Sequence, residues 1–218
     1  MNKLAVLLSA FFLAALVGSN ADNPKDKFET LRKDAEQGNA PAQFNLGWMH
    51  EYGEGVPKDS AKAVEWYRKA AEQGHAKAQS NLGVMYAKGD GVPKDLAKAV
   101  EWFRKAAEQG QAEAQYNLAA KYANGEGVPK DSAKAVQWWR KAAEQGYAAA
   151  QNGLGVMYAK GEGVPKDTVS AYMYLNLASS TESNAAKARD ELAKEMTPDQ
   201  ISEAQRLSRE WKPTTQPK

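Results

Sequence analysis

Hydrophobic and polar residues follow a helical period through most of this chain. Between residues 78 and 86 the apolar positions fall at offsets 0, 4, 7 and 8, and between residues 63 and 70 they fall at offsets 0, 3, 4 and 7. Both patterns place the apolar side chains on one face of a helix with about 3.6 residues per turn. No stretch shows the alternation of a strand. The pattern predicts an all-α protein built from amphipathic helices.

One pair of helices, with its connecting loop, recurs every 36 residues. The loop reads GEGVPKD or GDGVPKD, and its four prolines are Pro57, Pro93, Pro129 and Pro165. Neither helix of a pair can bury its apolar face alone, so the pairs must stack on one another. The fixed period, with no spacer between units, predicts an α-solenoid of stacked antiparallel helix pairs.

Residues at the ends of the predicted helices fit capping roles. The aspartate that closes each loop is the expected N-cap of the second helix, and a glycine ends that helix at Gly74, Gly110 and Gly146. Thr197 and Gln200 form a capping box for a last helix. We expect eleven helices and the following division: a signal peptide (1–21), an N-terminal capping helix (22–38), four repeats (39–180), a C-terminal capping helix pair (181–211) and a disordered tail (212–218).

Glycine also stands in the middle of first helices, at Gly47, Gly83 and Gly155. A mid-helix glycine costs roughly 1 kcal/mol relative to alanine. We expect a close approach between the two helices of a pair as the compensation. Ala119 fills this place in the third unit.

The first 21 residues have the three parts of a secretory signal. Lys3 precedes an apolar run from Leu4 to Val17, and small residues stand at Ser19 and Ala21. A membrane-spanning helix needs about 20 apolar residues, so this run is short for an anchor. We expect the signal to be removed, no integral membrane insertion afterwards, and a periplasmic or secreted protein.

Charge and cysteine content exclude several classes of function. The chain has 29 Lys and Arg, 27 Asp and Glu, and no cysteine. Losing Lys3 with the signal leaves a nearly neutral protein, which gives no electrostatic drive toward nucleic acid. Without cysteine, disulfides, thiol catalysis and thiolate metal sites are excluded.

The repeat itself resembles a known family. Its consensus A-x-A-Q-x-N-L-G-x-M-Y, then G-x-G-V-P-K-D, then A-K-A-V-x-W-Y-R-K-A-A-E-Q-G, is similar to the Sel-one-like repeat, a relative of the tetratricopeptide repeat. The likeness covers residues 39–178 closely. It implies a right-handed α-solenoid whose first helices line a concave surface, and an adaptor that holds other proteins together. Some exported members are cysteine-rich and linked to penicillin binding or β-lactamase activity; this chain lacks the cysteines, so that activity is not carried over.

The residues offer little for catalysis. A phosphate-binding loop needs G-x-x-x-x-G-K-[ST] between a strand and a helix, whereas Lys58 precedes Asp59 between two helices. His50 and His75 lack the i, i+4 partner of a helical zinc site, and the usual nucleophile motifs are missing. We therefore expect no catalytic residue, cofactor or metal. A cell-envelope hydrolase of β-lactam or peptidoglycan type and a glycan-binding accessory in polysaccharide export stay as alternatives.

The outer helices are expected to carry a solvated charged face and a packed aromatic row. Glu65 with Lys69, and Arg68 with Glu72, stand four residues apart, a spacing that favours ion pairs. The residues at the Trp66 position (Trp66, Trp102, Trp138, Tyr174) and at the next position (Tyr67, Phe103, Trp139, Leu175) recur every 36 residues, and their offsets predict core packing.

Differences between the repeats indicate a binding surface. Positions equivalent to Phe44 and Trp48 vary from unit to unit, while the core positions barely change. Exposed aromatic side chains on a groove-lining helix would anchor a partner, and neighbouring asparagines could bond a peptide backbone or another helix. The sequence predicts a monomer that binds a protein or peptide in the cell envelope, and the predicted partner-binding residues are Phe44, Trp48, Tyr116, Asn45, Asn81 and Asn117.

Overall fold

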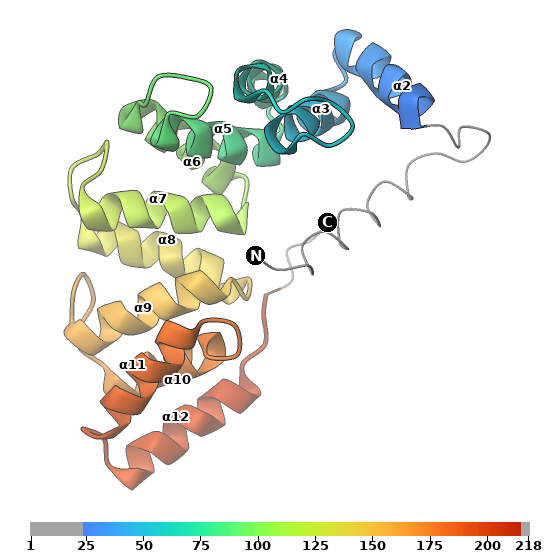
Figure 1. The fold of residues 1–218 in the computed structure, drawn as a ribbon. Helices are drawn as coiled ribbons and strands as arrows, with labels where there is room; N and C mark the ends of the chain where they lie inside the picture. Colours follow the sequence, from blue (N-terminus) through green and yellow to red (C-terminus); the bar gives the residue numbers. More distant parts are fainter. Residues whose placement is uncertain (1–23, 215–218) are drawn as a thin grey trace.

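The structure, a computed structural model, describes residues 24–214, and all of its regular elements are helices. The predicted signal peptide and the start of the capping segment lie outside the described residues. Within 24–214 the all-α solenoid of stacked helix pairs is confirmed, with eleven helices (Figure 1). They are α2 (Pro24–Glu36), α3 (Ala40–Tyr52), α4 (Ser60–Glu72), α5 (Ala76–Lys88), α6 (Leu96–Glu108), α7 (Ala112–Asn124), α8 (Ser132–Glu144), α9 (Ala148–Lys160), α10 (Thr168–Ala178), α11 (Ser183–Ala193) and α12 (Pro198–Glu210).

The helix pairs follow one another along a crescent. Figure 1 shows the long loops after α7 and α9 on its outer side, and the residues after α12 running along its inner side. In residues 24–214 no helix is long and apolar enough to cross a membrane.

The predicted caps are present. Asp59 Oδ1 accepts a 3.0 Å hydrogen bond from the backbone N of Lys62, and Asp95 and Asp131 cap α6 and α8 in the same way. Gly74 has a φ of 88°, which only glycine adopts easily and which lets the chain leave α4 at once. The capping box of Thr197 and Gln200 at the start of α12 is also formed.

The GxGVPKD loops are joints between helices. Gly91 has a φ of 68°, and a Cβ on it would collide with the backbone carbonyl of Ser60 at the start of the preceding second helix. Gly127 and Gly163 meet Leu96 and Ser132 in the same way. Each of these loops therefore packs against the pair before it, which explains why its glycine recurs.

The mid-helix glycines mark close contacts, as expected. A Cβ on Gly83 would lie 2.8 Å from the ring of Phe103, and one on Gly47 would lie 2.5 Å from the ring of Tyr67. In the third unit Ala119 takes this place, and the ring of Trp139 instead lies against Gly153, where a Cβ would be 3.0 Å away. In each of these three cases a glycine therefore stands where the large ring of the second helix makes a close contact.

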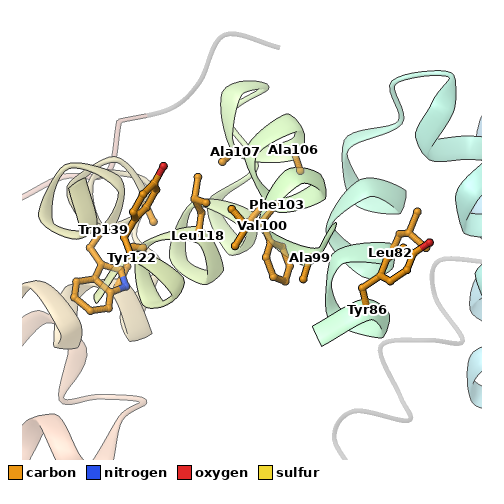
Figure 2. Close-up of a cluster of buried hydrophobic side chains, with 14 of the residues drawn as sticks. Leu82, Tyr86, Ala99, Val100, Phe103, Ala106, Ala107, Leu118, Tyr122 and Trp139 are labelled. Atoms are coloured by element: carbon orange, nitrogen blue, oxygen red, sulfur yellow. The ribbon is translucent and has the colours of Figure 1, made fainter. Parts of the chain in front are cut away.

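The aromatic rows divide between core and boundary. Tyr67, Phe103 and Trp139 are buried, and Figure 2 shows the last two within a cluster of buried hydrophobic side chains. Their neighbours at the Trp66 position are half-buried and pack against the edge of the core, so the expected core packing is met only in part for that row. Lysine ammonium groups lie over these rings, with Lys69 Nζ 4.0 Å from the centre of Trp66, and the equivalent pairs are Lys105 with Trp102 and Lys141 with Trp138.

The arginines of the second helices bind across the stack instead of along their own helix. Arg68 Nη2 donates a 3.1 Å hydrogen bond to the Tyr86 hydroxyl of the next pair, and Arg104 and Arg140 repeat this contact with Tyr122 and Tyr158. Among the described residues, the predicted ion pair between Arg68 and Glu72 is not formed. A tyrosine within reach of a planar guanidinium is the reason that these arginines recur.

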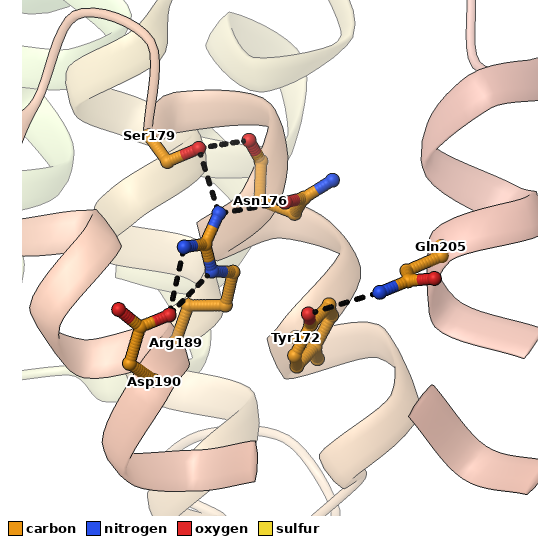
Figure 3. Close-up of polar contacts among 6 residues, drawn as sticks. All are labelled: Tyr172, Asn176, Ser179, Arg189, Asp190 and Gln205. Carbon is orange, nitrogen blue, oxygen red and sulfur yellow. Dashed lines mark hydrogen bonds and ion pairs between the residues drawn. The ribbon is translucent and has the colours of Figure 1, made fainter. Parts of the chain in front are cut away.

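The C-terminal helices close the array through polar contacts. Arg189 of α11 donates a 3.0 Å hydrogen bond to Asn176 of α10 and pairs with Asp190, while Gln205 of α12 bonds the Tyr172 hydroxyl (Figure 3). Helix α11 begins at Ser183, within the range that the sequence predicts. Residues 212–214, for which disorder is expected, instead lie against the turn between α8 and α9.

Candidate partner-binding face

The first helices carry a group of half-buried aromatic side chains outside the core. Trp48 and Tyr52, one turn apart on α3, lie with ring centres 5.1 Å apart. Tyr52 keeps 59 % of its surface exposed, and it is the one large hydrophobic side chain classed as exposed within residues 28–214. Exposed aromatic pairs of this kind can supply contact area to a partner at low entropic cost.

A carboxylate lies at the centre of this group. Glu51 Oε2 accepts a 2.6 Å hydrogen bond from the Tyr67 hydroxyl and a further bond from Tyr52. Burial, then the charge and hydrogen bond of Glu51, raise the pKa of Tyr52. The Tyr67 pKa is raised strongly by burial and by Glu51, while a hydrogen bond from Asn81 opposes the shift. Asn81 of α5 thus lies close enough to the Tyr67 hydroxyl of α4 to act on its pKa.

The other two predicted aromatics also meet rings from the next unit. Phe44 stacks on the imidazole of His75, with ring centres 4.8 Å apart and an interplanar angle of 24°. Tyr116 lies 5.4 Å from Tyr147 in the equivalent arrangement. His75 and Tyr147 precede α5 and α9, so each aromatic of a first helix covers the start of the following one. Both rings are half-buried and packed against the core.

Glu113 connects distant parts of this surface. Its charge raises the pKa of Tyr52 in the first unit and of Tyr147 in the fourth, in each case behind the larger effect of burial. A single carboxylate at the start of α7 thus acts electrostatically on residues of α3 and on the residue before α9.

We call the residues Phe44, Trp48, Tyr52, Tyr116 and Tyr147 the aromatic face. Sequence reasoning identified three of them and missed Tyr52, Tyr147 and the acidic residues beside them. Both tyrosines stand at positions that vary between the repeats, which is the sequence signal for them. The residues equivalent to Tyr52 are Lys88, Asn124 and Lys160, and those equivalent to Tyr147 are Asn39, His75 and Gln111.

Two of the predicted asparagines have unused hydrogen-bonding groups. Asn45 and Asn117 are half-buried, and neither side chain bonds another group within the described part of the chain. A half-buried amide without a partner is available to a peptide backbone. The aromatic face is therefore flanked by donors and acceptors.

The histidines and carboxylates between residues 28 and 214 are the side chains that could hold a metal ion. No three His, Asp or Glu side chains come together there as metal ligands. His50 is half-buried, and its Nδ1 is buried without a hydrogen-bond partner among the described residues. His75 uses its Nδ1 as an N-cap acceptor for Ala78 N at 3.2 Å. His75 therefore has a structural role as the N-cap of α5.

Comparison with known proteins supports the repeat assignment. The sequence model of the Sel1 repeat matches residues 40–75, 76–111, 112–147 and 148–180. The crystal structure of c5321, a protective antigen of uropathogenic Escherichia coli with an SLR fold, is 42% identical with a TM-score of 0.80, and the match covers 88% of this chain and 42% of that one. A Sel1 repeat protein from Oxalobacter formigenes is 33% identical with a TM-score of 0.70, over 85% of this chain and 84% of that one.

These matches define the family and not a specific activity. A search of proteins with curated functions finds no match. The chain spans less than half of the length of the E. coli antigen. The four matched repeats cover most of the described residues, so the chain belongs to the Sel1 repeat family.

Proposed function

We propose that this chain is a non-catalytic scaffold that binds a protein or peptide partner in its concave groove, with the aromatic face as the groove lining. The ring pair of half-buried Trp48 and exposed Tyr52 is the observation that carries this proposal. A ring pair left open to water costs hydration free energy, and a partner that covers it recovers about 25 cal/mol per Å² of apolar surface. Sel1 repeat scaffolds as a class are consistent with protein interaction.

The acidic residues define the partner's chemistry. Glu51 and Glu113 lie close enough to the aromatic face to raise tyrosine pKa values there. A bound segment would therefore offer apolar side chains to the rings and a cationic or N–H donor group to the carboxylates. Asn45 and Asn117 would bond its backbone.

Export is the second part of the proposal. Residues 1–21 have the composition of a signal peptide, which supports the proposal of a periplasmic or secreted scaffold. We further propose that this scaffold is a monomer. Sequencing the N-terminus of the protein from cell fractions tests this. A mature N-terminus near Asp22 in the envelope or medium is expected, and an intact Met1 in the cytosol would contradict it.

Crosslinking of variants in the native envelope tests the binding surface. Trp48→Ala with Tyr52→Ala should remove the crosslinked partner, because both rings leave the face while the core stays intact. Trp102→Ala, which removes a half-buried ring on a second helix, is the matched control and should leave capture unchanged. Equal capture by the double variant and the native protein, with both folded by circular dichroism, would contradict the site. Turnover of a β-lactam or muropeptide by pure protein would favour the hydrolase alternative, for which no described residue provides support.

A further inference from the structure

The residues after α12 are held in an extended segment against one helix end. The backbone N and the Oγ1 of Thr214 both donate to the carbonyl oxygen of Glu144, at 2.8 and 3.0 Å. The rings of Trp211 and Pro213 lie over Gly146, where a Cβ would be 3.6 and 3.7 Å from them. Figure 1 shows this segment passing along the inner side of the crescent. The chain thus contains its own example of a peptide bound at a helix end.

Beside Thr214 the surface is hollowed into a shallow cavity of about 260 Å³. We call this cavity and its lining edge site 3, because two equivalent sites, numbered 1 and 2, occur earlier in the chain. Gln145 and Gln115 line the cavity. Gln145 Nε2 donates to Gln115 Oε1 at 2.8 Å and to the carbonyl of Gly110 at 3.0 Å, and Gln115 Nε2 donates to the carbonyl of Ala107 at 3.1 Å. Glu108, Lys141 and Glu144 supply the charged rim.

The same site is built twice more along the stack. Edge site 2 lies 36 residues earlier, where Gln109 bonds Gln79 at 2.7 Å and Gln79 bonds the Ala71 carbonyl at 3.0 Å. Edge site 1 lies another 36 residues earlier, where Gln73 bonds Gln43 at 2.7 Å and Gln43 bonds the Ala35 carbonyl at 3.0 Å. The charged rim is also identical: it is Glu72, Lys105 and Glu108 in edge site 2, and Glu36, Lys69 and Glu72 in edge site 1.

The repeated sites differ in occupancy. Gly74 of edge site 1 stands in the place of Gly146, and a Cβ on it would find no atom within 4 Å beyond its chain neighbours. The described C-terminal segment, residues 211–214, contacts the last site through Gly146 and Glu144. Edge site 1 presents the equivalent surface again, and it is uncovered at Gly74.

The charges of segment and site are complementary. Each rim has two glutamates and one lysine, and the carbonyls at the end of a helix add partial negative charge. Residues 211–218 contain Lys212 and Lys218 and no acidic residue. Pro213 and Pro217 restrict the backbone and so lower the entropic cost of binding in an extended form.

We propose that edge sites 1 and 2 bind extended basic segments of a partner protein that share the pattern of residues 211–214, an aromatic residue followed two positions later by a proline and then by a free backbone N–H. The aromatic ring lies on the turn glycine, the N–H donates to the last-turn carbonyl, and the basic residues meet the glutamate rim. This interaction surface is separate from the aromatic face and does not depend on it.

Binding of a labelled synthetic peptide, WKPTTQPK, to the full chain tests the proposal by fluorescence anisotropy. Saturable binding is expected, and Glu72→Lys with Glu108→Lys should weaken it roughly fivefold or more, as expected for losing exposed charge pairs. The control is Glu65→Lys with Glu101→Lys, the same charge change on the same two helices away from the rim, and it should bind the peptide like the native chain. Replacing the peptide's tryptophan by alanine should also weaken binding.

Three results would overturn the proposal. One is the absence of saturable binding. A second is an equal loss in the rim and control variants, which would mean that only net charge matters. The third is self-association of the full chain that is reversed by added peptide. In that case the edge sites would bind the C-terminal segment of a second copy of this chain and not a partner protein. Since the rim variants leave Trp48 and Tyr52 intact, failure here and failure of the groove assignment are distinguishable.

Discussion

The hydroxyl of Tyr67 donates a 2.6 Å hydrogen bond to Glu51, and this pair exists in the first repeat alone. The equivalent residues are Phe103 and Ala87 in the second repeat, so the same packing is also achieved without polar groups. The first unit therefore places a carboxylate next to the exposed ring of Tyr52 where the other units place a methyl group. Glu51 therefore contributes both to the packing of the first unit, through Tyr67, and to the proposed binding surface, beside Tyr52.

Tyr67→Phe is expected to lower the free energy of unfolding by about 1–2 kcal/mol, because it removes a hydrogen bond to a charged group while keeping the ring. Glu51→Ala with Tyr67→Phe reproduces the second repeat and should be less destabilised than the two single changes combined. Urea unfolding of the four proteins gives the coupling energy. Additive effects would show that the two side chains do not depend on each other.

Gly83→Ala should destabilise the protein although alanine favours helix. The new Cβ would meet the Phe103 ring at 2.8 Å, and overpacking of this kind costs about 1–3 kcal/mol against a propensity gain of roughly 1 kcal/mol. Thermal unfolding measures the difference. Ala119→Gly is the informative comparison, since it removes a methyl group at the equivalent place. A higher unfolding temperature for Gly83→Ala would contradict the close contact.

Ser80→Ala should stabilise the protein. The Ser80 side chain is fully buried and its hydroxyl has no hydrogen-bond partner among the described residues, a situation that costs about 1–3 kcal/mol. An increase of about 1 kcal/mol in the free energy of unfolding is expected from urea titration. Ser170→Ala should have the opposite effect, because that hydroxyl donates a 2.6 Å bond to Asp167. A loss of stability in Ser80→Ala would mean that the hydroxyl does have a partner.

His75 should make stability depend on pH. Burial, and next the charge of Lys77, lower its pKa, and its unprotonated Nδ1 accepts the N-cap bond from Ala78. The unfolded state then binds the proton more readily, so stability is complete above the ordinary histidine pKa of about 6.5 and falls as the pH drops from there toward the lowered folded value.

Urea midpoints at pH 7.5 and 5.0 measure this effect. His75→Asn keeps a capping acceptor, as Asn39 does in the first repeat, and should reduce the difference between the two midpoints. Persistence of the full pH dependence in this variant would assign it to other groups.

The repeat pattern was enough to predict the architecture. A period of 36 residues, two apolar helix faces per period, and aspartate and glycine at the helix ends depend on short-range geometry that recurs identically in each unit, so the eleven helices and their caps follow from local rules. The close packing at Gly83 was predictable for the same reason. A single apolar pattern can leave the type and the ends of a helix uncertain, but four copies in the same register agree on both.

The surfaces depended on contacts between units, which no local rule specifies. Arg68 could pair with Glu72 on its own helix or with Tyr86 on the next pair, and the stacking geometry decides for Tyr86. The exposure of Tyr52 and the position of Thr214 at Glu144 likewise depend on how the units pack together. The sequence by itself determined the repeat, its helices and its caps. Only the tertiary structure decided which of the varying side chains lie close together. The reason is that side-chain packing sets a small rotation between neighbouring units, and these rotations add up along the stack.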